Sequence, residues 1–206
     1  MTEVGDGIAS TLTRSERKRA GQVERVARAA ARVFAQKGYE GANFDLIAAE
    51  LDLRGPSLYY YFSTKEELFL RCVQKSADEV FGRLRAVAES GLDPIETLRA
   101  LFREQVLIVV RDYPEFVPLF FKTYLPVHEL REAVLELRRE HAMLFEETAW
   151  QIQHWSKANR AEIRIWLGAA YGTLAYLPEW YDPSGEIGVD VLAAEVADLL
   201  VKPFLA

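Results

Sequence analysis

The chain has 206 residues, of which 50% are apolar and 27% are charged, the ordinary composition of a globular protein. No apolar run approaches the roughly 18 uncharged residues that a membrane span needs, and the N-terminus lacks the basic and then apolar pattern of a signal peptide. The single cysteine, Cys72, cannot form an internal disulfide, which favours a reducing cytoplasm as the location. One cysteine and three scattered histidines are too few and too dispersed for a structural zinc site, so we expect no such site and no cofactor.

The net charge of −6 is unevenly distributed along the chain. Residues 1–65 carry ten Lys or Arg against eight Asp or Glu, whereas residues 66–206 carry 15 against 23. The N-terminal part is therefore basic and the rest acidic. Such a division would let the basic part approach a polyanion while the acidic part points away from it. Chance variation between segments is the alternative explanation of this asymmetry.

The N-terminal third predicts a flexible tail over residues 1–16 and then three helices. Apolar residues spaced by three and four predict an amphipathic helix that ends at Gly38: Val23, Val26, Ala27, Ala30, Val33 and Phe34. Asn43 is a good N-cap for a short second helix, which buries Phe44, Ile47, Ala48 and Leu51 on one face. Gly55 and Pro56 then open a third short helix over residues 57–62.

The remaining two-thirds predict longer helices. A capping box of Ser63 and Glu66 begins a helix that runs to about Glu89, and Asp93 followed by Pro94 begins another that ends near Arg111. Pro114 and Pro118 bound a short aromatic segment. Three more helices are expected over residues 127–155, from Asn159 and Glu162 to about Tyr176, and over residues 189–201. No segment alternates with a period of two, so the chain is predicted to be all-α with about nine helices.

Two short helices joined by a tight turn, packed behind a first helix, are the arrangement of a helix-turn-helix DNA-binding unit. The stretches AARVFAQKGY (30–39), NFDLIA (43–48), SLYYYF (57–62) and KEEL (65–68) resemble, in order and spacing, the N-terminal domain of the TetR family of bacterial transcriptional regulators. The resemblance implies a three-helix DNA-binding domain over residues 17–65. It also implies a helical ligand-binding and dimerisation domain over residues 66–206.

The resemblance also assigns roles to individual residues of the DNA-binding unit. It places five of them against the DNA backbone, where tyrosine hydroxyls are rigid, uncharged donors for phosphates: Asn43, Tyr59, Tyr60, Tyr61 and Lys65. It places Gly55, Pro56 and Ser57 at base edges, and Leu58 and Phe62 in the core. Arg54 stands where the family usually has a serine-like cap, and we expect it to contact a guanine or a phosphate. Arg17, Lys18 and Arg19 are either an arm that touches DNA or a solvated segment.

The last two predicted helices are the candidates for dimerisation. Apolar and small residues surround the penultimate helix almost completely, so a neighbour must cover it on several sides: Ile163, Ile165, Trp166, Leu167, Gly168, Ala169, Ala170, Tyr171, Gly172 and Leu174. The last helix contributes Val191, Leu192, Val196, Leu199 and Leu200. A four-helix interface across a two-fold axis, as the family implies, would present two DNA-binding units to a palindromic operator. Burial within one subunit explains part of the same pattern.

The predicted body also contains aromatic residues that could line an effector pocket. In this family such helices often enclose a ligand cavity, and we take as candidates Phe102, Val106, Phe116, Phe120, Phe121, Tyr124, Met143, Trp166 and Tyr171. Ordinary core packing is the alternative for each. The stretch LPEWYDPSG (177–185) resembles a motif of TetR-family regulators of fatty-acid and steroid catabolism, which suggests a small hydrophobic or acyl-CoA-like effector. The phosphates of an acyl-CoA would require cations, for which Arg99, Arg103, Arg111 and Lys122 are candidates.

Catalytic motifs are absent from the sequence. It has no GxSxG, no P-loop and no HExxH, and His128, His141 and His154 share no metal-binding spacing, so these histidines are expected to be solvated or capped. We therefore expect a transcriptional regulator, a repressor released from DNA by an effector, and not an enzyme. One alternative keeps the DNA-binding unit but gives the body a protein partner in place of an effector. The other is a helical protein that does not bind DNA.

Overall fold

The computed structural model describes residues 13–122, 124–153, 155 and 160–205, and within them the chain forms only helices and connecting segments. The long elements are α1 (Arg14–Gly41), α3 (Lys65–Ala88), α4 (Pro94–Leu107), α5 (His128–Trp150), α6 (Arg160–Trp180) and α7 (Val189–Val201). The short elements are α2 (Phe44–Ala49), the 3₁₀ turns η1 (Gly55–Tyr60) and η5 (Lys202–Phe204), and the π turns η2 (Ile108–Asp112) and η3 (Pro118–Lys122). The all-α fold with an N-terminal helix-turn-helix is as predicted.

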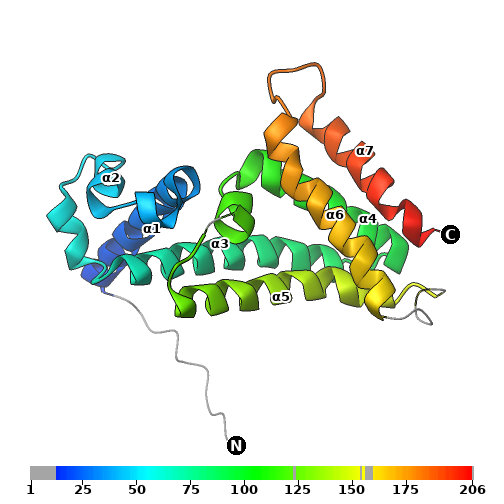
Figure 1. Cartoon of the computed structure of the whole chain (residues 1–206), viewed down its shortest axis with the longest axis horizontal. Coiled ribbons are helices and arrows are strands. Elements are labelled where there is room, and N and C mark those ends of the chain that lie inside the picture. The colour runs from blue at the N-terminus through cyan, green and yellow to red at the C-terminus, as the bar shows by residue number, and fades with distance from the viewer. Residues whose placement is uncertain (1–12, 123, 154, 156–159, 206) are drawn as a thin grey trace, which may run out of the picture.

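Helices α1, α2 and η1 form a head at one end of the molecule, and α3 runs from it into the body (Figure 1). Along one side of its length α3 buries Leu68, Phe69 and Cys72 beside α1, where the Phe69 ring meets Phe34 edge-on at 5.0 Å. Cys72 donates to the carbonyl of Ala27 at 3.2 Å, and burial raises the pKa of its thiol. The N-terminal half of α3 is therefore part of the core of the head.

The C-terminal half of α3 lies in the core of the body. There Phe81 is buried with its ring 6.5 Å from that of Phe120, and Leu84 is fully buried. Helix α5 packs beside α3, α4 packs against both, and α7 packs on α4 (Figure 1). The segment η3 also touches α1, so the body meets the head at a second place besides α3.

Most predicted helix boundaries agree with the structure, and the last helix has the predicted bounds of 189 and 201. The predicted tail is too long, because Thr13 and Glu16 form a capping box that starts α1 at Arg14. The helix predicted over residues 127–155 ends at Trp150. Asn159, the predicted cap of the next helix, lies outside the described residues, and that helix continues past residue 176 to Trp180 with Pro178 inside its last turn.

Two predictions near the turn between α2 and α3 are also corrected. The segment predicted as a helix over residues 57–62 is a 3₁₀ turn that begins two residues earlier, at Gly55. The cap of α3 is Thr64, whose hydroxyl accepts from the amide of Glu67 at 3.1 Å, in place of the predicted Ser63 and Glu66 pair. The Glu66 carboxylate instead accepts a hydrogen bond from the Tyr39 hydroxyl at 2.6 Å. Glu66 is therefore engaged by a residue distant in sequence and not by the predicted local cap.

Candidate nucleic-acid interface and effector site

Helices α2 and η1 present the predicted DNA-binding residues at one edge of the head. Asn43 caps α2 by accepting from the amide of Leu46 at 2.9 Å, which leaves the amide group of its side chain outside the helix. Arg54, Pro56 and Ser57 are exposed at the start of η1. Beyond them Tyr59 and Tyr60 are 63% and 70% exposed, although large aromatic side chains are normally buried. These side chains form a contiguous polar and aromatic surface.

The exposed tyrosines are oriented by packing on their inner sides. The Tyr59 ring lies 4.6 Å from that of Phe44, which α2 buries. The Tyr60 ring meets the Tyr61 ring edge-on at 5.0 Å, and the Arg19 guanidinium lies 5.8 Å from its centre. Tyr61 is half-buried, whereas the neighbouring Tyr59 and Tyr60 are exposed. Rings held in this way can offer their hydroxyls to a partner at little cost in side-chain entropy.

Gly55 is buried and lies where the two short helices approach each other. A Cβ atom at this position would be 1.8 Å from Oδ1 of Asp45, so the Asp45 side chain would have to move to admit any larger residue. This packing role is visible in the structure, while a contact between Gly55 and a base stays a prediction. Leu58 and Phe62 are buried in the core of the head, as expected.

Lys65 has a second role that the sequence did not predict. Its ammonium donates to the carbonyls of Tyr39 and Ala42, at 3.0 and 3.1 Å, and lies 4.5 Å from the centre of the Tyr39 ring. The Tyr39 hydroxyl donates to Glu66, and burial together with this carboxylate raises the pKa of the tyrosine. These contacts join the end of α1 to the start of α3. Lys65 therefore holds the head together, whether or not it also contacts a phosphate.

The basic residues near the N-terminus of the head are helical and not a separate arm. Arg17, Lys18 and Arg19 lie in the first turns of α1, and all three are exposed. Arg19 points its guanidinium toward the Tyr60 ring, which places one of these cations next to the exposed aromatic surface. A contact of Arg17 or Arg19 with DNA stays a prediction.

The body contains an aromatic cluster centred on His141 of α5. Its ring centroid lies between 5.3 and 6.3 Å from those of five neighbours, which are Phe81, Phe116, Phe121, Phe145 and Tyr171. Phe120 stacks on Phe116 at 4.3 Å, and Phe102 lies 5.5 Å from Phe145. Five of the nine predicted effector residues thus meet in one cluster, and Val106 is buried in the same core.

His141 is a buried polar residue, which corrects the expectation that it is solvated or capped. One ring nitrogen, Nε2, lies 2.8 Å from Oε1 of Gln105, and burial lowers the pKa of His141 to about 4, so the ring is neutral near pH 7. The hollow beside this pair, lined by Gln105, His141, Phe121 and Tyr171 among others, has a volume of about 10 Å³. The cluster is therefore closely packed around a polar centre.

The other three predicted effector residues lie on the surface. Tyr124, Met143 and Trp166 are 72%, 51% and 45% exposed. Their apolar character led sequence analysis to group them with the cluster, but their side chains are on outward-facing positions. Met143 instead borders an open hollow of about 540 Å³ between α5 and α6, which Trp150, Arg160 and Ile163 also line.

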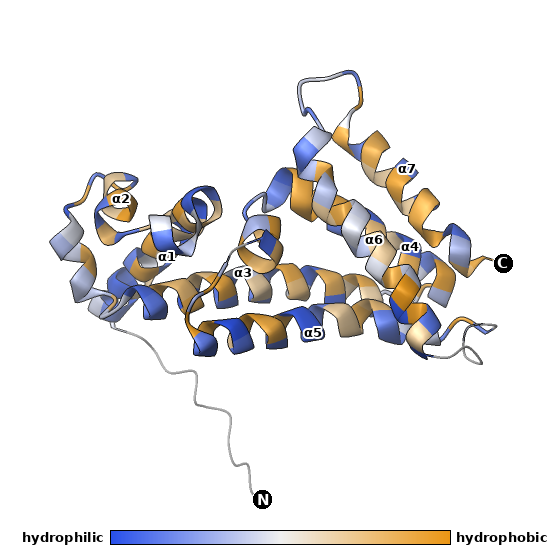
Figure 2. Cartoon of the chain, viewed as in Figure 1, coloured by the Kyte–Doolittle hydropathy of each residue, from blue (hydrophilic) through white to orange (hydrophobic). Residues whose placement is uncertain are grey.

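Helices α6 and α7 both carry exposed apolar side chains. Figure 2 shows hydrophobic residues along much of the visible surface of α7. On α6 the side chains at one face are exposed although they are apolar or small: Ile165, Trp166, Gly168, Ala169, Gly172, Tyr176 and Trp180. Val191 and Leu199 of α7 are also exposed. Five residues of the predicted α6 set are instead at least partly buried within the subunit: Ile163, Leu167, Ala170, Tyr171 and Leu174.

None of the described helices is long and apolar enough to cross a membrane. The described residues also contain no group of three His, Cys, Asp or Glu side chains that could hold a metal ion.

The fold and the exposed surface of the head define a protein of the helix-turn-helix class. Residues 26–72 match the family of bacterial regulatory proteins described as tetR, and residues 91–204 match the family described as Tetracyclin repressor-like, C-terminal domain. The second match alone covers more than half of the chain. The chain belongs to the TetR family of bacterial transcriptional regulators.

Individual relatives agree with this assignment. The transcriptional regulator LmrA of Bacillus subtilis is 30% identical over 129 residues, which is 60% of this chain and 69% of LmrA. The transcriptional activator FasR of Mycolicibacterium smegmatis is 36% identical over 72 residues, which is 35% of this chain but only 33% of FasR. The crystal structure of AibR in complex with isovaleryl coenzyme A and operator DNA has a TM-score of 0.74 at 21% identity, with 88% of this chain and 97% of AibR covered. At this identity the structural likeness concerns the fold.

The Lys65 contacts lead to a prediction about stability. Replacing Lys65→Met removes a charged donor from two carbonyls, and we expect the free energy of unfolding in urea to fall by about 2 kcal/mol. Lys37→Met is the control, because Lys37 is exposed in the same head and no hydrogen bond or ion pair of its ammonium is observed among the described residues. Equal stability of the Lys65→Met protein and the wild type would contradict the role of Lys65 in holding α1 to α3.

Proposed function

We propose that this chain is a homodimeric repressor that binds an operator through residues 17–65 and senses a small molecule through residues 66–206. The observation that carries the proposal is the exposed row of Arg54, Ser57, Tyr59 and Tyr60 on a head that a buried core holds rigid. Exposing two tyrosines in a row has no benefit for folding. It suits a surface that meets a polyanion, and family membership gives the same expectation.

In this proposal, side chains around η1 divide between phosphates and bases. Tyr59, Tyr60 and Asn43 donate to phosphates, and Tyr61 contributes mainly by supporting Tyr60. Pro56 and Ser57 face base edges, and Arg54 reaches a guanine or a phosphate. An ammonium has three donors, and two carbonyls occupy two of them, so Lys65 can give its third to a phosphate.

The dimer is proposed to form through the exposed faces of α6 and α7. Gly168, Ala169 and Gly172 would allow a partner helix to approach closely, because no atom of the same subunit lies within 4 Å of a Cβ built at either glycine. Ile165, Tyr176 and Val191 would then supply buried apolar area around this contact. A two-fold axis here places two heads on one face of the assembly, as a palindromic operator requires.

The effector is proposed to be small and hydrophobic or acyl-CoA-like, and to enter the aromatic cluster around His141. Isovaleryl coenzyme A, the ligand named for the AibR complex, belongs to this class. Since the hollow beside His141 is only about 10 Å³, binding requires rings to move apart. Phe121 is the side chain of the cluster best placed to move, because it is 38% exposed. Its ring also lies 5.4 Å from the guanidinium of Arg138.

A route from the cluster to the head follows from the chain itself. Phe116, Phe120 and Phe121 lie in the segment that includes η3, and η3 touches α1. A ligand that displaced these rings would therefore favour a different placement of η3 against the head. A ligand shifts such an equilibrium only through its different affinities for the two states.

The DNA-binding proposal is tested by fluorescence anisotropy on DNA flanking the gene, at several salt concentrations. We expect saturable binding that weakens with salt, because cationic side chains release counterions from phosphates. Tyr60→Phe removes only a hydroxyl and should weaken binding to all sequences about tenfold. The Arg54→Ala variant should reduce the magnitude of the salt slope by about 1 and relax sequence preference if Arg54 contacts a base.

The control for these variants is Arg139→Ala, because Arg139 is exposed on α5 and pairs with Glu136 one turn away. Its affinity for DNA should equal that of the wild type. Unchanged binding by both Tyr60→Phe and Arg54→Ala would show that DNA is not held by this edge of the head.

The dimer proposal is tested with Gly172→Leu, measured by sedimentation velocity. Leucine favours a helix by roughly 1 kcal/mol over glycine, and a Cβ here meets nothing within 4 Å, so the subunit should stay folded. Its side chain would however block a closely approaching partner, and we expect the dimer to dissociate. Gly82→Leu on α3 is the matched control, with the same free space and no place in the proposed interface. A Gly172→Leu protein that remains dimeric would contradict the interface.

A further inference from the structure

An open hollow of about 740 Å³ lies where the head meets the body, and arginines from three elements line it. Arg28 and Arg32 come from α1, Arg83 from α3 and Arg111 from η2. We call this hollow the arginine cleft. Glu79, Asp112, Tyr113 and Glu115 complete its lining, so four cationic side chains face three carboxylates. The formal charge of these lining residues is therefore +1, in a chain whose net charge is −6.

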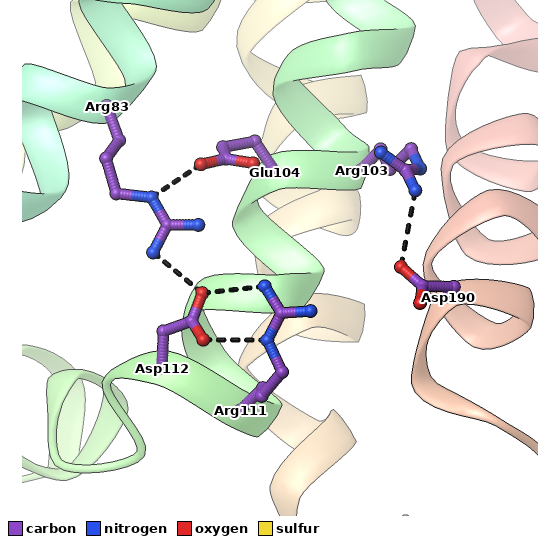
Figure 3. Close-up of polar contacts among 6 residues, drawn as sticks. All are labelled: Arg83, Arg103, Glu104, Arg111, Asp112 and Asp190. Carbon is purple, nitrogen blue, oxygen red and sulfur yellow. Dashed lines mark hydrogen bonds and ion pairs between the residues drawn. The ribbon is translucent and has the colours of Figure 1, made fainter.

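The four arginines differ in how firmly they are held. Arg83 bridges Glu104 and Asp112 at 2.6 and 2.7 Å, and it is the most buried of the four (Figure 3). It therefore has a structural role, since it ties α3 to α4 and η2. Asp112 also accepts two hydrogen bonds from Arg111, the next residue in the chain, and these two arginines hold the pKa of the Asp112 carboxyl below its usual value.

Arg28 and Arg32 are held weakly. Arg28 lies 3.8 Å from Glu79, whose carboxylate is already 2.8 Å from Lys75. Arg32 lies 3.5 Å from Glu50. About half or more of each of the Arg28 and Arg32 side chains is exposed, and ion pairs of this kind contribute little to stability. The Arg111 side chain is 46% exposed, but it makes two hydrogen bonds to Asp112. A multiply charged anion can replace such partners, because an arginine fork matches the oxygens of a phosphate.

The other cations that sequence analysis considered for phosphates are engaged elsewhere. Arg99 pairs with Asp198, Arg103 with Asp190 of α7, and Lys122 with Glu179 of α6 (Figure 3 shows the Arg103 pair). These pairs join helices of the body to one another. Of those four candidates, only Arg111 lines the arginine cleft.

We propose that the arginine cleft binds the phosphate groups of a ligand that carries at least two phosphates, such as coenzyme A or a nucleotide. Arg28 and Arg32 stand on the head and Arg111 stands on the body, so two phosphates can be held from both sides of the cleft. This inference deepens the proposed function and rests on it, because it names the ligand class that the body senses. A ligand held in this way would link α1 directly to η2 and so bias the position of the head.

The experiment measures binding of unacylated coenzyme A, and separately of ADP, to the full chain by isothermal titration calorimetry at low salt. We expect binding that weakens with added salt. Arg28→Ala and Arg111→Ala should each weaken it about tenfold, since each removes a charge-assisted contact. Both side chains are substantially exposed, so the variants should fold, and circular dichroism checks this. Arg139→Ala is the control, because Arg139 is an exposed arginine of α5 outside the cleft.

The two probes distinguish the sources of the phosphates. Equal binding of coenzyme A and ADP, reduced in both arginine variants, supports a site that recognises phosphates alone. Tighter binding of coenzyme A, with the same losses, supports a site that extends to the rest of that molecule. Absence of binding by both probes at millimolar concentration overturns the inference, as does binding that neither arginine variant reduces.

DNA binding of the same preparations is measured in parallel. If the wild type binds DNA saturably while neither probe binds, the arginine cleft is not the ligand site and the proposed function stands. If the wild type binds DNA no better than random sequence while coenzyme A binds in the cleft, the proposed function fails and the site stands.

Discussion

Helix α3 contributes to the hydrophobic core in both the head and the body, and the arrangement of the molecule follows from this. Phe69 packs with Phe34 in the head, and Phe81 packs with Phe120 in the body, on one helix of 24 residues. A continuous helix transmits rotation and tilt between its ends. The contacts of Lys65 and Tyr39 at its first turn fix the rest of the head to it. The position of the DNA-binding surface is therefore set by the packing of the body.

This constraint gives the exposed faces of α6 and α7 their importance. If the two bodies pair through these faces, each α3 points its head in a direction fixed by that pairing, and the distance between heads becomes a property of the dimer. Any change within the body that moves α3, or that moves η3 against α1, alters this distance. The aromatic cluster touches both elements, since Phe81 belongs to α3 and Phe120 belongs to η3. A ligand bound at His141, as proposed, would thus have a short physical route to the proposed DNA-binding surface.

Ion pairs add a second set of connections around the same junction. Arg83 joins α3 to Glu104 on α4, and Arg103 on the opposite side of α4 joins it to Asp190 on α7 (Figure 3). Such surface pairs contribute little stability individually, and their value here is geometric, because they link the helices on which the head and the proposed dimer interface depend.

Much of the fold could be predicted from the sequence because local signals dominate it. The bounds of α7 and the N-cap at Asn43 follow from periodicity and capping chemistry. Contacts distant in sequence could not be predicted in this way. Lys65 was expected only to contact the DNA backbone, whereas its ammonium also donates to the carbonyls of Tyr39 and Ala42.

The aromatic cluster of the body was predicted in part for the same reason. Aromatic composition identified Phe116 and Phe120, but spacing alone did not show that Tyr124 and Met143 face outward. It also gave no sign that His141 is buried against Gln105, 36 residues earlier in the chain. The arginine cleft combines residues numbered 28, 32, 83 and 111, and only the folded chain brings them together.

The distance between the two heads tests most directly whether two paired subunits place their heads on adjacent grooves of DNA. A spin label on Ser63→Cys would report it by electron-electron double resonance, because Ser63 is exposed beside η1 while Cys72 is buried and stays unlabelled. In the presence of operator DNA the account predicts one main distance on the order of 35 Å, one turn of the double helix. Absence of a dipolar signal at protein concentrations that saturate the DNA would contradict a dimer that places two heads on adjacent grooves.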